Sequence, residues 1–276
     1  MDKIKLSVVI PTLNEEKFIS HLLNDLSNQT YQDFEVVVVD AGSIDNTAKI
    51  VDSYRDKLKL TFYNLKIKNV SIQRNYGGRH AKGNYLFFID ADMRLSNGFI
   101  KKIIKNINKS KGLIYLFRLA PISRHLHDQI IFNIMNNLLE ISQYTLKPFA
   151  PGGNMVFQKD FFLFLGGFDK KSKLSEDHEL IQRAKQRGVT AKFINNLYAK
   201  FSMRRFQHEG RLAIFIKYSL TLIYTLKRGK VEKSPFEYQM GGGQYYRGLA
   251  KDKKTKINFN DYLKKLKSYL SEISNS

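Results

Sequence analysis

Two short apolar runs, each leading into a polar loop, constrain the fold of this chain more than any other feature. Leu6 to Ile10 is cut off by Pro11, and the valine-rich run Phe34 to Val39 leads directly into Asp40. Continuous apolar, β-branched runs of this length are typical of strands that are covered on both faces, as in parallel sheets. Helix-like segments alternate with these runs, so the first half predicts an α/β domain with a mostly parallel central sheet flanked by helices.

Capping and turn residues place the other expected elements. Asn14 is expected to cap a helix that has Glu15 and Glu16 in its first turn, because a side-chain oxygen there can accept a bond from a free helical N–H. The other expected elements are a helix after the turn at Gly42 to Asp45, strands at 57–63, 85–89 and 154–157, and helices at 125–146 and 175–187, the last capped by Ser175 and stopped by Gly188.

The composition limits the compartment and the partners. A net charge of +21 favours an anionic partner: a phosphate-bearing substrate, a membrane surface or nucleic acid. The lysines are scattered, so an ordinary solvated surface accounts for part of this excess. The absence of cysteine excludes disulfides and cysteine-ligated metals. The N-terminal apolar run is too short for an export signal, so we expect a cytoplasmic protein, with a peripheral position on the cytoplasmic face of a membrane as the alternative.

Carboxylates follow two of the expected strands. Asp40 ends one strand, and Asp90 and Asp92 follow another. Ligands of open α/β sheets bind beyond the carboxyl ends of the strands, so these acids are expected to meet at a ligand site. Two carboxylates at this spacing suit a hard cation such as Mg²⁺ or Mn²⁺, which takes oxygen ligands and completes its shell with phosphates and water. Taken alone, the pair is equally compatible with an ordinary acidic turn.

A second acidic pair, Glu176 and Asp177, begins the helix expected after Ser175. The helix dipole favours acids in a first turn, which is a sufficient structural reason for them. A carboxylate at such a loop-to-helix junction also suits a general base that takes a proton from an acceptor hydroxyl.

Eight short motifs, in a fixed order, decide between these readings. They are Ser7-Val-Val-Ile-Pro-Thr-Leu-Asn-Glu15, Val39-Asp-Ala-Gly-Ser-Ile-Asp-Asn-Thr47, Arg74-Asn75 with Gly77, Ala81-Lys-Gly83, Phe88-Ile-Asp-Ala-Asp92, Gly152-Gly-Asn154, Gly166-Gly-Phe-Asp169 and Glu176-Asp177. In this order and spacing the chain resembles glycosyltransferase family 2, whose members are inverting and have the GT-A fold, across roughly its first two hundred residues.

The resemblance implies a Rossmann-like GT-A catalytic domain over residues 1–206, with a nucleotide-binding half to about 95 and an acceptor half from 96. Residues 207–276 form the expected C-terminal helical extension. The implied nucleotide-sugar contacts are Pro11, Thr12, Glu15, Asp40, Gly42, Arg74, Asp90, Ala91 and Asp92. Of these, Thr12 and Glu15 hold the ribose and base, Asp40 reads the base, and Arg74 faces the diphosphate or ribose. The implied donor is a UDP- or GDP-sugar.

The resemblance assigns the chemistry to the second half. Asp90 and Asp92 surround a Mn²⁺ or Mg²⁺ ion and the nucleotide, and Asp177 is the catalytic base. The implied sugar and acceptor pocket is formed by Gly152, Gly153, Asn154 and Glu176. One departure is that Asp40 is followed by Ala41 where many relatives carry a second acid, so base recognition is expected to differ.

Three residues after this region have two readings each. Arg204 and Arg205 are expected either to clamp a phosphate with their planar guanidinium groups or to form a solvated basic turn. His208 is considered as a further metal ligand, against an ordinary structural histidine.

Two apolar helices have several expected partners. The segment 209–228 is too short to span a bilayer, and its basic ends suit an anionic membrane surface as well as packing against the domain or a second copy of the chain. The stripe from Ile130 to Leu146 is expected either to border the acceptor site or to be plain core. The acceptor is unidentified, and the basic surface favours a lipid-linked one.

Three other functions compete with sugar transfer. A sugar nucleotidyltransferase would carry a glycine-rich phosphate loop where Pro11 to Glu15 stands. A basic binding module for anionic lipid or nucleic acid fits the net charge but not the acids at the sheet edge, so no nucleic acid is expected. An inactive relative that retains the fold is the third alternative.

Overall fold

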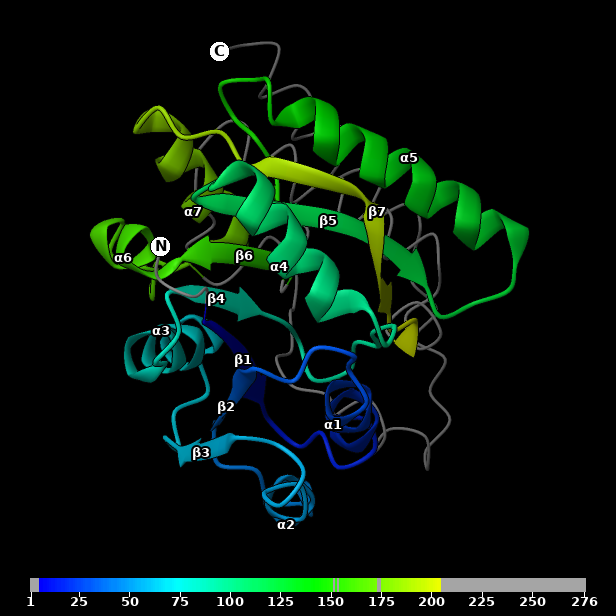
Figure 1. Cartoon of the computed structure of the whole chain (residues 1–276), viewed down its shortest axis with the longest axis vertical. Coiled ribbons are helices and arrows are strands. Elements are labelled where there is room, and N and C mark those ends of the chain that lie inside the picture. Colours follow the sequence, from blue (N-terminus) through cyan, green and yellow to red (C-terminus); the bar gives the residue numbers. More distant parts are fainter. Residues whose placement is uncertain (1–4, 151, 153, 173–174, 205–276) are drawn as a thin grey trace, which may run out of the picture.

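The computed structural model describes residues 5–150, 152, 154–172 and 175–204. Within these residues, one sheet of seven strands in the order β3-β2-β1-β4-β6-β5-β7 runs through the molecule, with helices on both faces (Figure 1). This confirms the predicted α/β class and the mostly parallel sheet. The strands are β1 (Leu6–Thr12), β2 (Phe34–Asp40), β3 (Leu60–Asn64), β4 (Tyr85–Phe88), β5 (Ile114–Pro121), β6 (Met155–Gln158) and β7 (Lys192–Phe201).

The strand directions bring the acidic loops to one edge. β1 is parallel to both β2 and β4, so the carboxyl ends of these three strands meet there. In the β1–β2 register Thr12 stands opposite Asp40. β6 is antiparallel to β4 and β5, and it joins the second half of the chain to the first within the same sheet.

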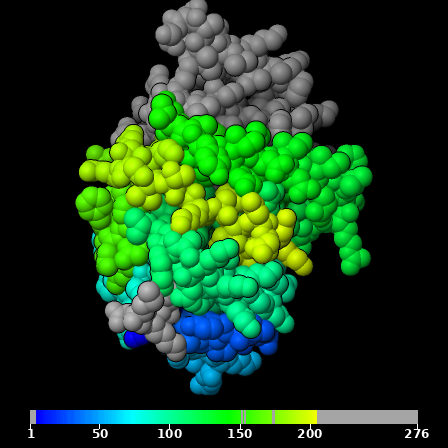
Figure 2. All heavy atoms as spheres, turned by 45° about the horizontal axis from the view of Figure 1, so that its top comes forward, coloured from blue at the N-terminus to red at the C-terminus, as the bar shows by residue number. Residues whose placement is uncertain are grey.

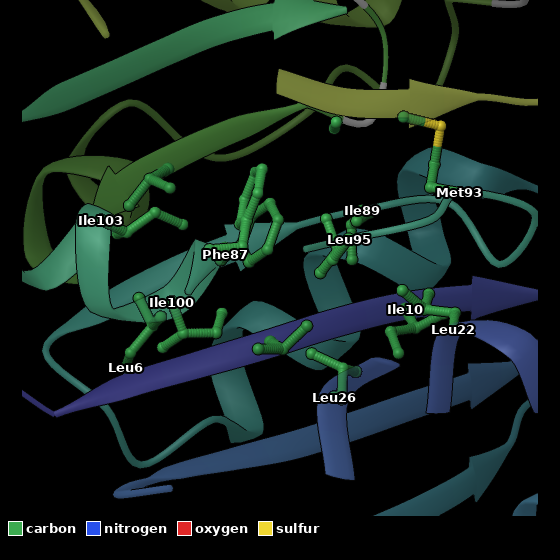
Figure 3. Close-up of a cluster of buried hydrophobic side chains, with 14 of the residues drawn as sticks. Leu6, Ile10, Leu22, Leu26, Phe87, Ile89, Met93, Leu95, Ile100 and Ile103 are labelled. Atoms are coloured by element: carbon green, nitrogen blue, oxygen red, sulfur yellow. The ribbon is translucent and has the colours of Figure 1, made fainter. Parts of the chain in front are cut away.

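The helices pack on the sheet through two apolar clusters, one on each face. On one face, β1 and β4 contact α1 and α4 through residues such as Ile10, Leu22 and Phe87 (Figure 3). On the other, α3 approaches β1 so closely that a Cβ at Gly77 would lie 2.4 Å from Val9 Cγ1. The helices are α1 (Ile19–Ser27), α2 (Thr47–Asp52), α3 (Val70–His80), α4 (Phe99–Ser110), α5 (Leu126–Ser142), α6 (Lys159–Phe164) and α7 (Glu176–Gln186).

The start of the first helix differs from the sequence prediction. The helix begins at Ile19 rather than after Asn14, which has a left-handed backbone with φ of 55°. The Asn14 Oδ1 accepts a bond from the Ile44 N–H (2.9 Å), and the Glu15 N–H donates to Thr47 Oγ1 (2.8 Å). The polar groups expected to start the helix therefore join two loops at the sheet edge.

Smaller differences affect three other elements. The strand expected at 57–63 is β3, Leu60–Asn64, and the helix expected to reach 146 ends at Ser142. Ser175 precedes α7 as predicted, but its backbone is left-handed and its side chain makes no capping bond. Gly188, with φ of 79°, follows the end of α7 as expected for a helix stop. Among the described residues, no helix is long and apolar enough to cross a membrane.

Candidate active site

Asp40 organises the loop after β2. Its carboxylate accepts bonds from Thr12 Oγ1 (2.8 Å), from the backbone N–H groups of Gly42 (2.9 Å) and Ser43 (2.7 Å), and from Ser43 Oγ (2.5 Å). Gly42 has φ of 85°, a conformation that favours glycine. Asp40 is completely buried, and the bonds it makes are to its own strand neighbours and loop. Its contact with a nucleotide base stays a prediction.

A buried arginine joins three elements at the sheet edge. Arg74, on α3, donates to Asp90 Oδ1 (2.8 Å) beyond β4 and to Glu176 Oε1 (2.7 Å) at the start of α7. Its guanidinium lies 5.3 Å from the ring centre of Phe168. Burial alone would lower the pKa of Arg74, but the charges of Asp90 and Glu176 raise it above its ordinary value. Arg74 is therefore a permanent cation between the two acids.

A second arginine forms a similar bridge. Arg204 binds both carboxylate oxygens of Glu15 (2.8 and 3.1 Å), and its Nε lies 3.0 Å from Asp92 Oδ2. Its guanidinium lies 5.1 Å from the ring centre of Phe18. Because its side chain is only 13% exposed and paired with acids, the reading of Arg204 as a solvated turn residue is wrong. Glu15 and Arg204, 189 positions apart, are thus held together.

Glu15 is the acid whose titration is moved most clearly toward neutral pH. Burial raises its pKa to about 7, helped by the nearby charges of Asp92 and Asp90 and opposed by Arg204. Desolvation of the carboxylate thus outweighs its bidentate bond to the guanidinium. Near neutral pH the charge of Glu15 therefore changes with small shifts in its surroundings.

Asp177 is held as an anion at the start of α7. Its Oδ2 accepts a bond from the Gly152 N–H (2.6 Å) and lies 3.3 Å from His178 Nδ1. Burial alone would raise the pKa of Asp177, but the charge and hydrogen bond of His178, together with Arg74 and Gly152, lower it overall. In return, Asp177 raises the pKa of His178 despite burial of the imidazole. Asp177 is therefore unprotonated near neutral pH, as a proton acceptor must be, and its lowered pKa makes it a weak base.

Asn154, two residues after Gly152, has an unused hydrogen-bond acceptor. Asn154 is 1% exposed, and its Oδ1 is buried and has no hydrogen-bond partner among the described residues. A buried polar atom without a partner costs free energy unless a ligand or water satisfies it. This atom therefore points to a ligand or an ordered water at the Asn154 side chain.

The acids predicted from the sequence thus form one acidic region together with Arg74 and Arg204, which pair with them. Asp177 and Asp90 both act on the pKa of Arg74, while Asp90 and Asp92 both act on that of Glu15. His178, for which we predicted no role from the sequence, also belongs to this region, because its Nδ1 lies 3.3 Å from Asp177 Oδ2; its only local signal is its place directly after Asp177. Pro11 lies in β1 opposite Val39, and Ala91 is buried between the two aspartates. Gly153, Arg205, His208 and the helix expected at 209–228 lie outside the described residues.

The acids fit a divalent cation only together with a phosphate ligand. Within residues 5–204, where these are described, no group of three histidines or acids is arranged to hold a metal by itself. Asp90 and Asp92 supply two carboxylates in one loop, and the Asp90 side chain is 38% exposed. Mg²⁺ and Mn²⁺ are commonly bound through one or two carboxylates and the oxygens of a bound phosphate, so this pair fits such an ion.

Solved structures with the same arrangement of strands are GT-A transferases. TarS residues 1–349 from Staphylococcus aureus, in complex with UDP-GlcNAc, give a TM-score of 0.61 at 24% identity over 72% of this chain and 58% of that one. The mannosyltransferase PcManGT from Pyrobaculum calidifontis, in complex with GDP-Man and Mn²⁺, gives 0.67 at 16% identity over 100% of this chain and 76% of that one. The fold is therefore the GT-A fold.

The sequence comparison adds the family. The model of glycosyl transferase family 2 matches residues 7–164, so the chain belongs to this family. The poly(ribitol-phosphate) beta-N-acetylglucosaminyltransferase TarS of S. aureus strain Mu50 is 34% identical over 44% of this chain and 22% of its own. The amylovoran biosynthesis glycosyltransferase AmsB of Erwinia amylovora is 26% identical over 98% of both chains. The chain thus spans about a fifth of the length of TarS but nearly all of AmsB.

Proposed function

We propose that this protein is an inverting glycosyltransferase that moves a sugar from a nucleotide-sugar donor to an acceptor hydroxyl or phosphate. The observation that carries the proposal is the environment of Asp177: a buried, ionised carboxylate that accepts from the Gly152 N–H and is next in sequence to Glu176, which pairs with Arg74. The family membership supports the same reaction class.

The reaction assigned to this site moves one proton and exchanges one bond. Asp177 takes the proton of the acceptor as the acceptor oxygen attacks the anomeric carbon. The bond from that carbon to the diphosphate breaks at the same time, so the configuration inverts and a nucleoside diphosphate leaves with added negative charge. No covalent sugar–enzyme intermediate is required, because the acceptor attacks directly.

The donor is assigned to the other side of the region. Thr12, Glu15 and Asp40 border the nucleoside, and Arg74 and Arg204 are the cations that face the diphosphate. Asp90 and Asp92 would hold a Mn²⁺ or Mg²⁺ ion, which neutralises charge on the departing diphosphate when bound. TarS is solved with UDP-GlcNAc and PcManGT with GDP-Man and Mn²⁺, which supports a UDP- or GDP-sugar here.

The rest of the proposal concerns organisation and location. We assign residues 1–206 to the catalytic domain and 207–276 to an extension. A cytoplasmic location with peripheral contact to the membrane, and a lipid-linked acceptor, are consistent with the net charge of +21.

The first experiment separates chemistry from binding. Asp177→Asn should reduce sugar transfer at least a hundredfold, roughly the contribution of a general base, because the amide cannot accept the proton. A panel of UDP-, GDP- and dTDP-sugars with Mn²⁺, read by thermal stabilisation, should identify the same donor for this variant as for the parent.

Asp92→Ala is the matched comparison. It should weaken the Mn²⁺-dependent part of the stabilisation by the donor, because it removes one of two carboxylates from the proposed ion site. Normal turnover by Asp177→Asn would show that the base is assigned wrongly, and a panel in which no nucleotide-sugar stabilises the parent would remove the proposed function itself.

A further inference from the structure

Helix α5 has its apolar side turned away from the sheet. Five large residues on one stripe of the helix are each 48% to 69% exposed. These residues, which we call the α5 ridge, are Leu126, Ile130, Ile134, Leu138 and Ile141. Beyond the helix end the exposed apolar surface continues with Tyr144 and Leu146, at 82% and 88% exposed. Contiguous exposed apolar surface of this kind indicates an interaction site.

Polar contacts on the inner side fix this orientation. The Asn136 amide pairs with the backbone of β5, accepting from the Leu119 N–H (2.8 Å) and donating to the Leu119 carbonyl (2.8 Å). Asp128 is buried and accepts from Ser123 Oγ (2.6 Å). Rotating the helix to bury the ridge would expose these groups and break their bonds. The ridge therefore faces outward because the inner side of α5, which also buries Phe132 and Leu139, carries these bonded polar groups.

The exposed charges around the ridge are positive. The two acids of α5 are both engaged elsewhere, since Asp128 is buried and Glu140 accepts from Arg118 (2.9 Å) and Asn195 (2.6 Å). Exposed cations stand beyond both ends of the helix, at Arg124 and Lys147. The ridge thus has no exposed carboxylate and is flanked by positive charge.

The shape of the surface favours a broad partner. In Figure 1, α5 lies along the outer side of β5 and β7, and in Figure 2 the green segment that contains it reaches the right-hand edge of the view. A protruding helix with a row of aliphatic side chains, an exposed tyrosine at one end and flanking cations matches the interface of a bilayer with anionic headgroups. A second copy of the chain would bring the same net charge of +21 against it and lacks this complementarity.

We infer that the α5 ridge docks this protein on the surface of an anionic lipid bilayer, with the aliphatic side chains entering the headgroup region and the flanking cations meeting lipid phosphates. The inference concerns location and does not depend on which sugar is transferred, or on sugar transfer at all. It assigns the membrane contact to described residues rather than to the segment 209–228.

The direct test is vesicle binding by the full chain. The parent should co-sediment with phosphatidylcholine vesicles that contain about one third phosphatidylglycerol, and far less with phosphatidylcholine alone, because the anionic lipid supplies the charge. The variant Ile130→Gln, Ile134→Gln, Leu138→Gln should bind at least tenfold more weakly. An unchanged melting midpoint and unchanged nucleotide-sugar binding would show that the variant is folded, whether or not the protein transfers sugar.

The matched control changes three exposed cations on α4: Lys101→Gln, Lys102→Gln and Lys105→Gln. This variant should keep most of the binding if the ridge makes the contact. Equal losses in the two variants would indicate general electrostatic adsorption and would overturn the assignment to α5, as would full binding by the α5 variant.

A fluorescently labelled variant tests whether another segment of the chain or a second copy already covers the ridge. Because the chain has no cysteine, Ile134→Cys gives a single site for a polarity-sensitive fluorophore. Its emission should shift to the blue only when anionic vesicles are added. A blue-shifted emission in buffer would show that another segment or a second copy already covers the ridge, and sedimentation would separate these two cases; either result would refute the membrane assignment.

Discussion

The two buried arginines of the site each pair with two acids, but the acids lie on different kinds of structural element. Arg74 connects α3, the loop after β4 and the start of α7, and its side chain is 3% exposed. Arg204, which follows β7, connects the loop after β1 with the loop after β4, and its side chain is 13% exposed. The Arg74 bridge joins elements of the packed domain, whereas the Arg204 bridge joins loops. We therefore expect the first to support the fold and the second to respond to pH and ligand.

The largest effect should follow removal of the first guanidinium. Arg74→Met should lower the free energy of unfolding by about 3–5 kcal/mol, because it leaves Glu176, whose side chain is 13% exposed, and the partly exposed Asp90 without their cation. Chemical denaturation at pH 7.5 measures this. Arg55→Met, at an exposed pair with Asp52, is the control and should cost roughly 0.5 kcal/mol or less. A small effect at Arg74 would remove the distinction between the two bridges.

The pH dependence of the unfolding free energy should show the effect of the second bridge, between Arg204 and Glu15. The pKa of Glu15 is about 7 in the folded protein, above its ordinary value of 4.5. Between pH 4.5 and pH 7, the Glu15 carboxyl is therefore protonated in the folded protein and ionised in the unfolded chain. The contribution of Glu15 to the unfolding free energy should therefore fall by about 2 kcal/mol as the pH rises from 5 to 8.

Glu15→Gln should remove this part of the slope, because the amide does not titrate. Denaturation series at several pH values for parent and variant provide the measurement. An unchanged slope in the variant would assign the titration to another group.

The smallest effect is expected for the second guanidinium. Arg204→Met should cost about 1–2 kcal/mol at pH 8, and less at pH 6, because Glu15 can then accept a proton and no longer needs a cation. The same denaturation series tests this. A cost that is equal at both pH values would mean that Arg204 acts mainly through Asp92 or Phe18.

The sequence predicted the strands of the site and the positions of its acids. Buried parallel strands leave a local signature, and β1 and β2 lie where their apolar runs stand, with Asp40 at the end of its strand. β4 ends at Phe88, one residue earlier than predicted, so Ile89 stands between the strand and Asp90. These features could be found because each depends on a few neighbouring residues.

The contacts that join these elements could not be predicted. The bond between Arg204 and Glu15 spans 189 positions and has no local pattern. The first helix starts late because Asn14 bonds to a loop thirty residues away. For α5, periodicity indicated an apolar stripe, but not which side faces the sheet. The expectation that this stripe is plain core is wrong for the α5 ridge, because polar groups such as Asn136 occupy the inner side.

The antiparallel strand β6 has a consequence for how this protein can be made. It separates β4 from β5, and its pairing joins Tyr85 to Gln158 across most of the middle of the chain. Until β6 has emerged from the ribosome, the edge of β4 that pairs with it is exposed. An exposed strand edge favours association with other chains. Fragments that stop near residue 95 should therefore aggregate during expression, and the nascent chain is expected to require protection until β6 has emerged.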